Sequence, residues 1–211
     1  REIDLICISE INLKENNKFS LNISIDGYME PFFQGSKTAR GGVAIYVRSD
    51  LNVLERKDLN CIDPSFEAIW IEIKNKTSKN VLCSCIYRHP CGDIDTFNNY
   101  ITKALNKINK ENKTCYVTGD FNIDLLKYEA INKYSVFLNT VTSFGYLPHI
   151  LQPTRISEYS STLIDNIFGN NFSDDALSGN ILLKFADHLT QFITVKKDNT
   201  RKKPKEIYTR D

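Results

Sequence analysis

Seven short segments rich in β-branched and aromatic residues recur along the chain, and this recurrence constrains the fold more than any other feature. The segments are residues 4–9, 42–48, 66–73, 81–87, 115–119, 162–168 and 191–195. Several alternate apolar with polar residues, which is the two-residue period of a strand that buries at least one face. The chain is therefore expected to build β-sheets that pack against another layer.

Two further segments, residues 95–110 and 131–144, have a helical period instead. The apolar residues on one face of each are Phe97, Ile101, Leu105 and Ile108 in the first and Tyr134, Phe137, Leu138 and Val141 in the second. Asp93 or Asp95 is placed to cap the first helix, and Gly145 suits the left-handed residue that ends the second. Because strands outnumber helices, we predict an α/β fold of the α+β type, a four-layered sandwich in which two packed mixed β-sheets are flanked by helices.

The length and composition fit one domain. A chain of 211 residues lies within the range of large layered folds, and 41% hydrophobic and 25% charged residues are typical of a globular protein. No apolar run is long enough for a membrane span, so no membrane partner is expected. We expect the domain to cover residues 1–195 and a basic C-terminal linker to follow over residues 196–211.

Charge and cysteine usage narrow the possible sites. The formal net charge is only +1, so any DNA binding has to be local. The chain has six cysteines, but a protein of this size does not need disulfides, and reduced thiols inside a cell are expected. A zinc site is set aside because Cys83 and Cys85 alternate along a predicted strand and the three histidines form no cluster with ligand spacing.

Two predicted strands end in acidic residues. Asp120 and Asn122 follow an apolar strand and Gly119, and alternation points both side chains the same way, although a simple turn is the commoner interpretation of these residue types. Glu10 ends the first strand, where its carboxylate is placed like a ligand for a hard metal ion, or like an ordinary strand terminus.

Two further acids lie in the C-terminal third of the chain. Asp165 interrupts an apolar strand, where an unpaired carboxylate is costly and a histidine is the obvious partner. Asp187 and His188 precede the last strand and can supply a metal ligand and a proton-transfer group, or form an ordinary loop.

The order of these residues resembles the endonuclease/exonuclease/phosphatase superfamily, most of all the endonuclease domain of non-LTR retrotransposon polyproteins. The matching motifs are residues 5–10, 40–47, 86–90, 119–122, 152–155, 161–165 and 187–188. Each motif is weak alone, but several in the same order are specific. The resemblance spans almost the whole chain and implies a metal-dependent phosphodiesterase.

The same resemblance implies a role for each matching residue. Glu10 would ligate Mg²⁺ or Mn²⁺, and Asp187 would lie near the same ion. Tyr87 would contact the phosphate. The hydrolytic centre would be completed by residues that orient the attacking water, the phosphate and the imidazole, namely Asp120, Asn122, Asp165 and His188. The general base would be either Asp120 or His188.

The resemblance also implies a substrate and a context. The enzyme would nick one strand of DNA and leave a 3′-hydroxyl from which a reverse transcriptase domain of the parent polyprotein primes, in the cytoplasm and nucleus. Residues expected to bind the substrate are Arg88, Thr154, Arg155, Ser161 and Thr162.

Two departures from the family pattern keep other hypotheses open. Ala186 stands where these enzymes usually have a serine, and the chain begins at Arg1, after the strand that carries the family's metal-site asparagine. A catalytically impaired copy that acts as a binding module is therefore one alternative. Another phosphoesterase of the superfamily, acting on abasic sites or phosphoinositides, is the second.

Overall fold

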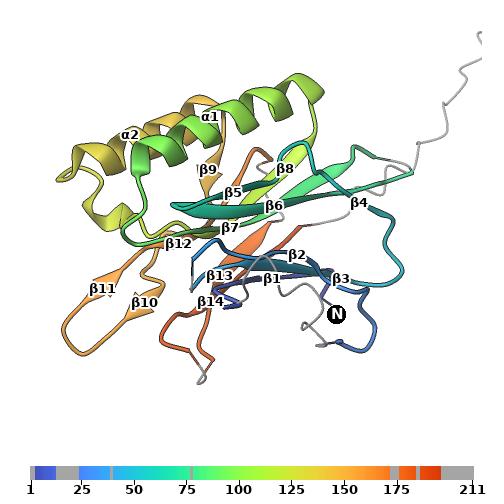
Figure 1. The fold of residues 1–211 in the computed structure, drawn as a ribbon, viewed down its shortest axis with the longest axis horizontal. Coiled ribbons are helices and arrows are strands. Elements are labelled where there is room, and N and C mark those ends of the chain that lie inside the picture. The colour runs from blue at the N-terminus through green and yellow to red at the C-terminus, as the bar shows by residue number, and fades with distance from the viewer. Residues whose placement is uncertain are drawn as a thin grey trace, which may run out of the picture.

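The computed structural model describes residues 3–12, 24–38, 40–76, 78–171, 176–183 and 186–195. The linker predicted over residues 196–211 lies outside this described part. The chain forms two layers of β-sheet, with both described α-helices covering one of them (Figure 1). This is the predicted α+β sandwich, and the described residues supply three of its layers.

A mixed seven-stranded sheet forms the central layer. Its strands run in the order β4, β6, β7, β8, β12, β9, and β5 also pairs with β6. Their bounds are Val53–Glu55 (β4), Cys61–Asp63 (β5), Phe66–Ile73 (β6), Val81–Arg88 (β7), Thr114–Asp120 (β8), Leu147–Pro148 (β9) and Asp165–Gly169 (β12). Only β7 and β8 are parallel; the other pairs in this sheet are antiparallel.

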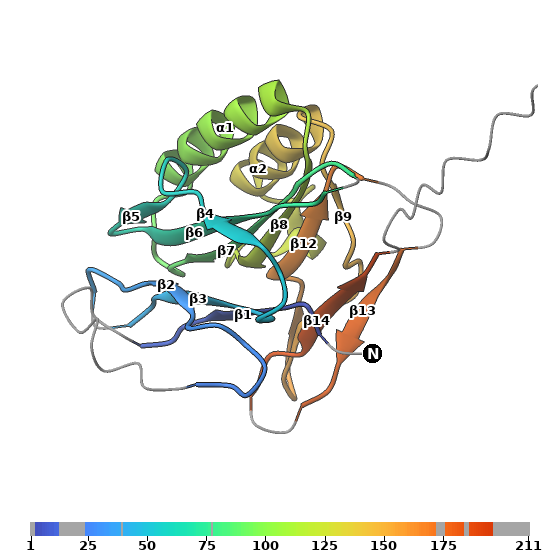
Figure 2. The same cartoon turned by 90° about the vertical axis from the view of Figure 1, so that its right-hand side faces the viewer.

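The second layer packs against one face of this sheet. It contains a sheet in the order β1, β3, β2, built from Leu5–Ser9, Val43–Val47 and Phe32–Gln34. We expected a mixed sheet here, but the described strands of this sheet are all antiparallel. A separate hairpin of β13 (Leu177–Ile181) and β14 (Thr190–Thr194) lies on the same side (Figure 2). A short hairpin of β10 (Arg155–Ile156) and β11 (Ser161–Thr162) projects from the body of the molecule (Figure 1).

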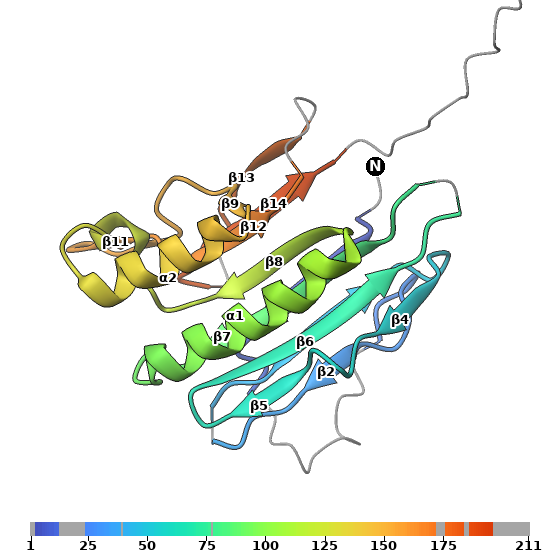
Figure 3. The same ribbon diagram turned by 90° about the horizontal axis from the view of Figure 1, so that it is seen from above.

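Two helices cover the opposite face of the seven-stranded sheet. They are α1 (Ile94–Glu111) and α2 (Asn132–Ser143), which lie side by side above it (Figure 3). Asp93 caps α1 by accepting from the backbone N–H groups of Asp95 and Thr96, and Gly145 (φ 84°) follows α2 in the left-handed region. Among the described residues no helix has the length and apolarity that crossing a membrane requires.

Each face of the central sheet carries its own core. Even-numbered residues of β6, such as Phe66 and Trp70, pack under the helices. Odd-numbered residues, such as Ile69 and Ile71, pack against β1 and β3. This alternation decides which polar side chains can meet at the end of the sheet.

The strand predicted over residues 162–168 is divided in two. Leu163 donates its N–H to Asp124 Oδ1 at 3.0 Å and accepts from Leu125 N at 2.9 Å, and Ile164 O accepts from Phe121 N at 2.9 Å. The backbone at these two residues therefore bonds to the loop after β8 instead of continuing the β11 ladder. The interruption ties the Asp120 loop to the beginning of β12.

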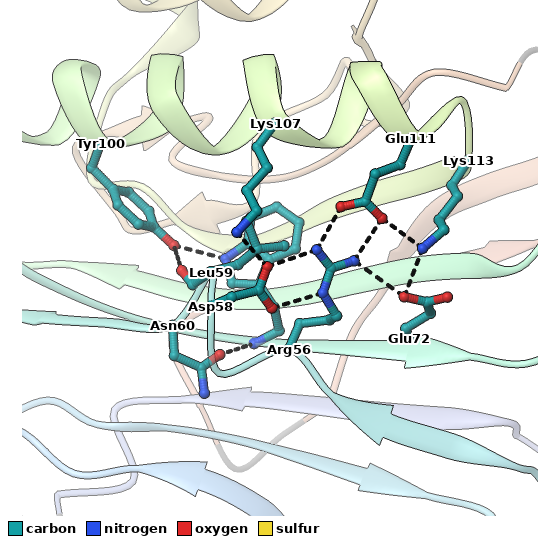
Figure 4. Close-up of polar contacts among 10 residues, drawn as sticks. Arg56, Asp58, Leu59, Asn60, Glu72, Tyr100, Lys107, Glu111 and Lys113 are labelled. Atoms are coloured by element: carbon teal, nitrogen blue, oxygen red, sulfur yellow. Dashed lines mark hydrogen bonds and ion pairs between the residues drawn. The ribbon is translucent and has the colours of Figure 1, made fainter.

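A buried arginine joins the helix layer to the edge of the sheet, at the end where β7 and β8 begin. Arg56 has an 8% exposed side chain and forms ion pairs with Asp58 (2.8 Å), Glu72 (3.1 Å) and Glu111 (2.6 Å) (Figure 4). Lys113 bonds Glu72 and Glu111 at 2.9 and 2.5 Å. Because three carboxylates share one guanidinium, its removal leaves the buried Glu72 and the more exposed Asp58 and Glu111 without this partner.

We expect Arg56→Ala to lower the free energy of unfolding by about 3 kcal/mol. The matched control is Arg48→Ala, because Arg48 pairs with Asp4 and Asp50, whose side chains are 62% and 65% exposed. Solvent-exposed pairs contribute about 0–1 kcal/mol. Urea denaturation followed by circular dichroism measures both values, and equal losses would contradict the role given to the Arg56 cluster.

The same cluster predicts how stability depends on pH. Hydrogen bonds from Arg56 lower the pKa of Asp58 and of Glu111 below their usual ranges. A carboxyl whose pKa is lower in the folded state stabilises the fold above its unfolded pKa of about 4, and this contribution is lost as the pH falls through the folded value. Urea midpoints should therefore fall more steeply below pH 4 in the wild type than in Arg56→Ala.

Candidate active site

Four polar residues form one row across four neighbouring strands. Glu67 of β6 is in register with Tyr87 of β7, Tyr87 with Asp120 of β8, and Asp120 with Asp165 of β12. Cross-strand partners in register project to the same side of a sheet. The row lies on the face that packs against the β1–β3–β2 layer, so residues separated by up to a hundred positions in sequence meet at one end of the sheet.

Asp120 is the last residue of β8 and is only 4% exposed. Its Oδ1 accepts the backbone N–H of Asn122 at 2.9 Å, while the Asn122 side chain donates to the carbonyl of Arg88 at 2.7 Å. Asn122 has a φ of 47°, so the chain turns at once after the strand. The alternation argument for Asp120 and Asn122 therefore does not hold, although the turn keeps the two residues in contact.

Asp165 and His188 form the acid–imidazole pair of the site. His188 Nδ1 lies 2.9 Å from Asp165 Oδ2 and 3.1 Å from Oδ1. Since a carboxylate accepts, the proton belongs on Nδ1, and Nε2 is the nitrogen left for a substrate. The acid is 6% exposed and the side chain of His188 is 24% exposed, so the pair reaches from the core to the surface.

Thr154 supports this pair through hydrogen bonds to Asp165 and to the backbone next to His188. Its hydroxyl donates to Asp165 Oδ2 at 2.6 Å and accepts from the backbone N–H of Asp165 at 3.1 Å. Its carbonyl accepts from Leu189 N at 2.6 Å, next to His188. The sequence predicted that Thr154 binds the substrate. Because Thr154 is completely buried beneath the site, it cannot contact a substrate.

Burial and hydrogen bonding shift two pKa values at this site. Burial raises the pKa of Asp120 to about 7, and the negative charge of Asp165 adds to the effect. The hydrogen bond with Asp165 raises the pKa of His188. The site thus holds an acid that ionises near neutral pH beside an imidazole that favours its protonated form.

Glu10 joins the site through Tyr87. The Tyr87 hydroxyl donates to Glu10 Oε1, and burial together with this bond raises the tyrosine pKa well above its usual range. Glu10 follows β1 with a φ of 54° and is exposed to solvent. Its charge contributes to the raised pKa of Asp120, so the two carboxylates lie within electrostatic reach of each other.

Asp187 pairs with an arginine of the projecting hairpin. Its carboxylate forms an ion pair with Arg155 at 2.7 Å, and this guanidinium lowers the pKa of the acid. Arg155 begins the projecting β10–β11 hairpin, where Ser161 and Thr162 form the facing strand. A pocket of about 290 Å³ lies between this hairpin and Asp187. Its lining residues are Arg155, Ile156, Ser157, Ser160, Thr162 and Asp187.

Arg88 is not at the surface of the site. It is 2% exposed, and its guanidinium donates at 2.6 Å each to the carbonyls of Phe121, Gly92 and Asn122. Tyr87 and Arg88 are neighbours on one strand, so they must project to opposite faces, and this signal was available in the sequence. Arg88 supports the Asn122 turn from the helix side instead of binding a substrate.

The residues present fit a divalent cation. Among the residues that the structure describes, the one group whose acid and imidazole ligand atoms converge within 4.8 Å is Asp120, Asp165 and His188. Carboxylate oxygens are the preferred ligands of Mg²⁺ and Mn²⁺, so the two acids suit such an ion while His188 remains available to act beside it. Neither Glu10 nor Asp187 belongs to this group, although Glu10 lies at its edge through Tyr87.

Glu67 and His89 form a second acid–histidine contact, and the sequence analysis assigned no role to either residue. Glu67 is fully buried, and its Oε1 lies 2.9 Å from Nε2 of His89. The available signal was Glu67 itself, the one acid among the odd-numbered residues of the apolar strand 66–73, because a buried acid requires a polar partner. Its neighbours, however, come from the loop after β7 and the loop before β3, which only the tertiary structure brings together.

Comparisons with known proteins agree with this architecture. Residues 1–188 match the Endonuclease/Exonuclease/phosphatase family, and no curated protein matches the sequence. The endonuclease domain of TRAS1, a telomere-specific non-LTR retrotransposon, is similar in structure with a TM-score of 0.64 and 15% identity over 82% of each chain.

Two further solved structures are also similar. The catalytic domain of APE2 from Xenopus laevis has a TM-score of 0.60 at 15% identity, over 91% of this chain and 83% of that one. An AP endonuclease from Archaeoglobus fulgidus has a TM-score of 0.61 at 16% identity, over 90% and 88%. These likenesses show the fold, while the sequence match covers most of the chain, and the protein therefore belongs to the Endonuclease/Exonuclease/phosphatase family.

Proposed function

We propose that the protein is a divalent-metal-dependent phosphodiesterase that nicks one strand of DNA. The observation that carries the proposal is the convergence of Asp120, Asp165 and His188, whose ligand atoms lie within 4.8 Å of one another at the end of the central sheet. These residues come from three distant segments, and two of them are buried acids. Buried acids that crowd together destabilise a fold, which is typical of sites selected for chemistry.

The geometry supports distinct roles for these side chains. Asp120 keeps one carboxylate oxygen outside its bond to Asn122 and can accept the proton of an attacking water. Asp165 fixes the imidazole of His188, so that Nε2 can hold a phosphate oxygen as negative charge develops there. Tyr87 lies on the strand at the other side of Asp120 from Asp165 and would contact the phosphate, and Glu10, which accepts its hydroxyl, would help to hold Mg²⁺ or Mn²⁺. When bound, such an ion supplies Lewis-acid stabilisation of the phosphate.

The β10–β11 hairpin is the part of the site best placed to contact a nucleic acid. Tyr159 in the turn of this hairpin is 90% exposed, and Ile156, which lines the pocket next to Asp187, is 57% exposed. Exposed aromatic and aliphatic side chains can stack on or insert between bases, while Arg155, Ser161 and Thr162 offer donors to phosphates. This hairpin favours DNA over a small phosphoester as the substrate.

The retroelement context extends the same proposal. The TRAS1 domain belongs to a non-LTR retrotransposon, and the shared fold supports a nick that leaves a 3′-hydroxyl for a reverse transcriptase domain of a parent polyprotein. The place of action would then be the cytoplasm and nucleus. Thr154 holds Asp165 in the Asp165–His188 pair, so this pairing does not depend on a serine at position 186.

A plasmid assay tests the function. We expect the wild-type chain to convert supercoiled DNA to the nicked form with Mg²⁺ or Mn²⁺ and not with EDTA, and His188→Ala to lower the rate about 10²–10⁴-fold. His149→Ala is the control, since His149 packs near Tyr116 away from the site. Wild-type protein that binds DNA without cutting it would support the binding-module alternative. Faster cleavage of abasic than intact DNA would assign the chain to the repair-like branch.

A further inference from the structure

Glu67 is a fully buried carboxylate for which the proposed chemistry has no use. Its Oε1 accepts from the Ser36 hydroxyl and contacts His89 Nε2 at 2.9 Å, and its Oε2 accepts from Gly42 N at 3.2 Å. A buried carboxylate is retained only where several donors compensate its lost hydration. All of these donors lie outside the Asp120, Asp165 and His188 group.

The donors on one side of Glu67 belong to a glycine turn that is packed tightly against it. Gly41 and Gly42 have φ values of 120° and 87°. A Cβ at Gly41 would lie 2.7 Å from His89 Cε1 and 2.9 Å from Glu67 Oε2. The backbone of the turn therefore rests directly on the Glu67–His89 pair, and only glycine permits this approach.

The carbonyls of this glycine turn also accept hydrogen bonds from the backbone that follows Glu10. Asn12 N donates to Gly41 O at 2.8 Å and Ile11 N donates to Gly42 O at 3.2 Å. These bonds fix the backbone immediately after Glu10, which itself has a left-handed φ of 54°. From the other side, the Tyr87 ring that bonds Glu10 packs edge-on against the His89 ring, with centroids 5.0 Å apart.

We propose that Glu67 and His89 are positioning residues that set the affinity of the site for a divalent cation, by fixing the Glu10 carboxylate through Gly41, Gly42 and Tyr87. The inference rests on the proposed function in one respect, that Glu10 helps to hold the cation. Outer residues that orient a metal ligand typically change metal affinity 10–100-fold when they are substituted. Neither residue touches the reacting atoms, so the maximal rate at saturating metal should change little.

The test measures Mn²⁺ alone, by electron paramagnetic resonance of the free ion, in the full chain without DNA. Glu67→Ala is expected to weaken Mn²⁺ binding about tenfold or more, and Glu67→Gln less, because its amide oxygen still accepts from Gly42 N. Glu72→Gln is the matched control. Glu72 is also a buried acid of β6, but it lies in the Arg56 cluster and should leave Mn²⁺ affinity unchanged.

Hydrogen exchange of individual amides gives a second readout. The Ile11 and Asn12 amides should exchange faster in Glu67→Ala than in the wild type, while those of β8 keep their protection. If Glu67→Ala does not fold, Glu67→Gln and His89→Ala carry both measurements, with weaker binding expected in each.

The outcomes separate this inference from the proposed nuclease. Wild-type affinity in the folded Glu67 variants, or a wild-type protein that binds no Mn²⁺, would overturn the positioning role. Mn²⁺ binding that weakens as expected in a chain that cuts no DNA would uphold it and remove only the nuclease activity.

Discussion

Asp120→Asn should abolish DNA nicking and at the same time make the metal-free protein more stable. Loss of a general base lowers rates about 10²–10⁴-fold. The amide keeps an oxygen for the bond from Asn122 N, so the turn after β8 can remain intact. A residue that mattered only for folding would lose activity and stability together.

The gain in stability follows from the sign of the pKa shift. Burial and Asp165 raise the folded pKa of Asp120 to about 7, above its unfolded value of about 3.9. The ionised acid therefore costs folding energy, fully above pH 7 and progressively less as the pH falls toward the unfolded pKa. Replacing it with a neutral amide should raise the free energy of unfolding by about 1–3 kcal/mol at pH 8 and by less at pH 5.

Thermal and urea unfolding in EDTA at pH 8 and pH 5, beside the plasmid assay, measures both parts. Asp95→Asn is the control for loss of one negative charge, because Asp95 is an exposed acid of α1 paired with Lys133. It should keep wild-type nicking and gain no stability. Full nicking activity in Asp120→Asn would remove Asp120 from the proposed chemistry.

Gly119→Ala should damage the fold and the site more than the same substitution at the other described glycines. A Cβ at this position would lie 1.9 Å from the carbonyl oxygen of Ile86 on the neighbouring parallel strand, at a φ of 151°. Neither backbone can move without separating β7 from β8. We expect a loss of more than about 3 kcal/mol of unfolding free energy.

The damage should reach catalysis even in the molecules that stay folded. Gly119 directly precedes Asp120, so displacing it moves that acid away from Asp165 on β12. The control is Gly145→Ala, where φ is also positive (84°) but no atom lies within 4 Å of the added methyl. This variant should lose only about 1 kcal/mol and keep wild-type nicking. Similar losses in the two variants would show that the β7–β8 contact at Gly119 is not critical.

The larger elements were predictable because their signals are local. The strand predicted over residues 66–73 matches β6, and the helix predicted over residues 95–110 differs from α1 by one residue at each end. Asp93 was one of the two caps considered, and it is the one observed. Short strands such as β4, β5 and β9, with two or three residues each, were missed because so few positions carry no readable period.

The candidate site was predictable only in part. Local features singled out Asp120, Asp165 and His188, a resemblance of ordered motifs grouped them into one site, and the structure brings these three side chains together. Their assigned chemistry is still a prediction. Alternation along β7 could have shown that Arg88 opposes Tyr87, whereas nothing in the sequence near Thr154 indicates that its hydroxyl is buried against Asp165.

The sequence by itself determined the layers of this protein, since the periods of two and of 3.6 residues dictate which segments form strands or helices and which faces are apolar. Only the tertiary structure decided which polar residues meet. Register placed Glu67, Tyr87, Asp120 and Asp165 in one row, and loop packing paired Arg155 with Asp187 and the Glu67–His89 pair with the glycine turn. The physical reason is that periodicity reports the burial of a side chain, while its partner depends on how strands distant in sequence align.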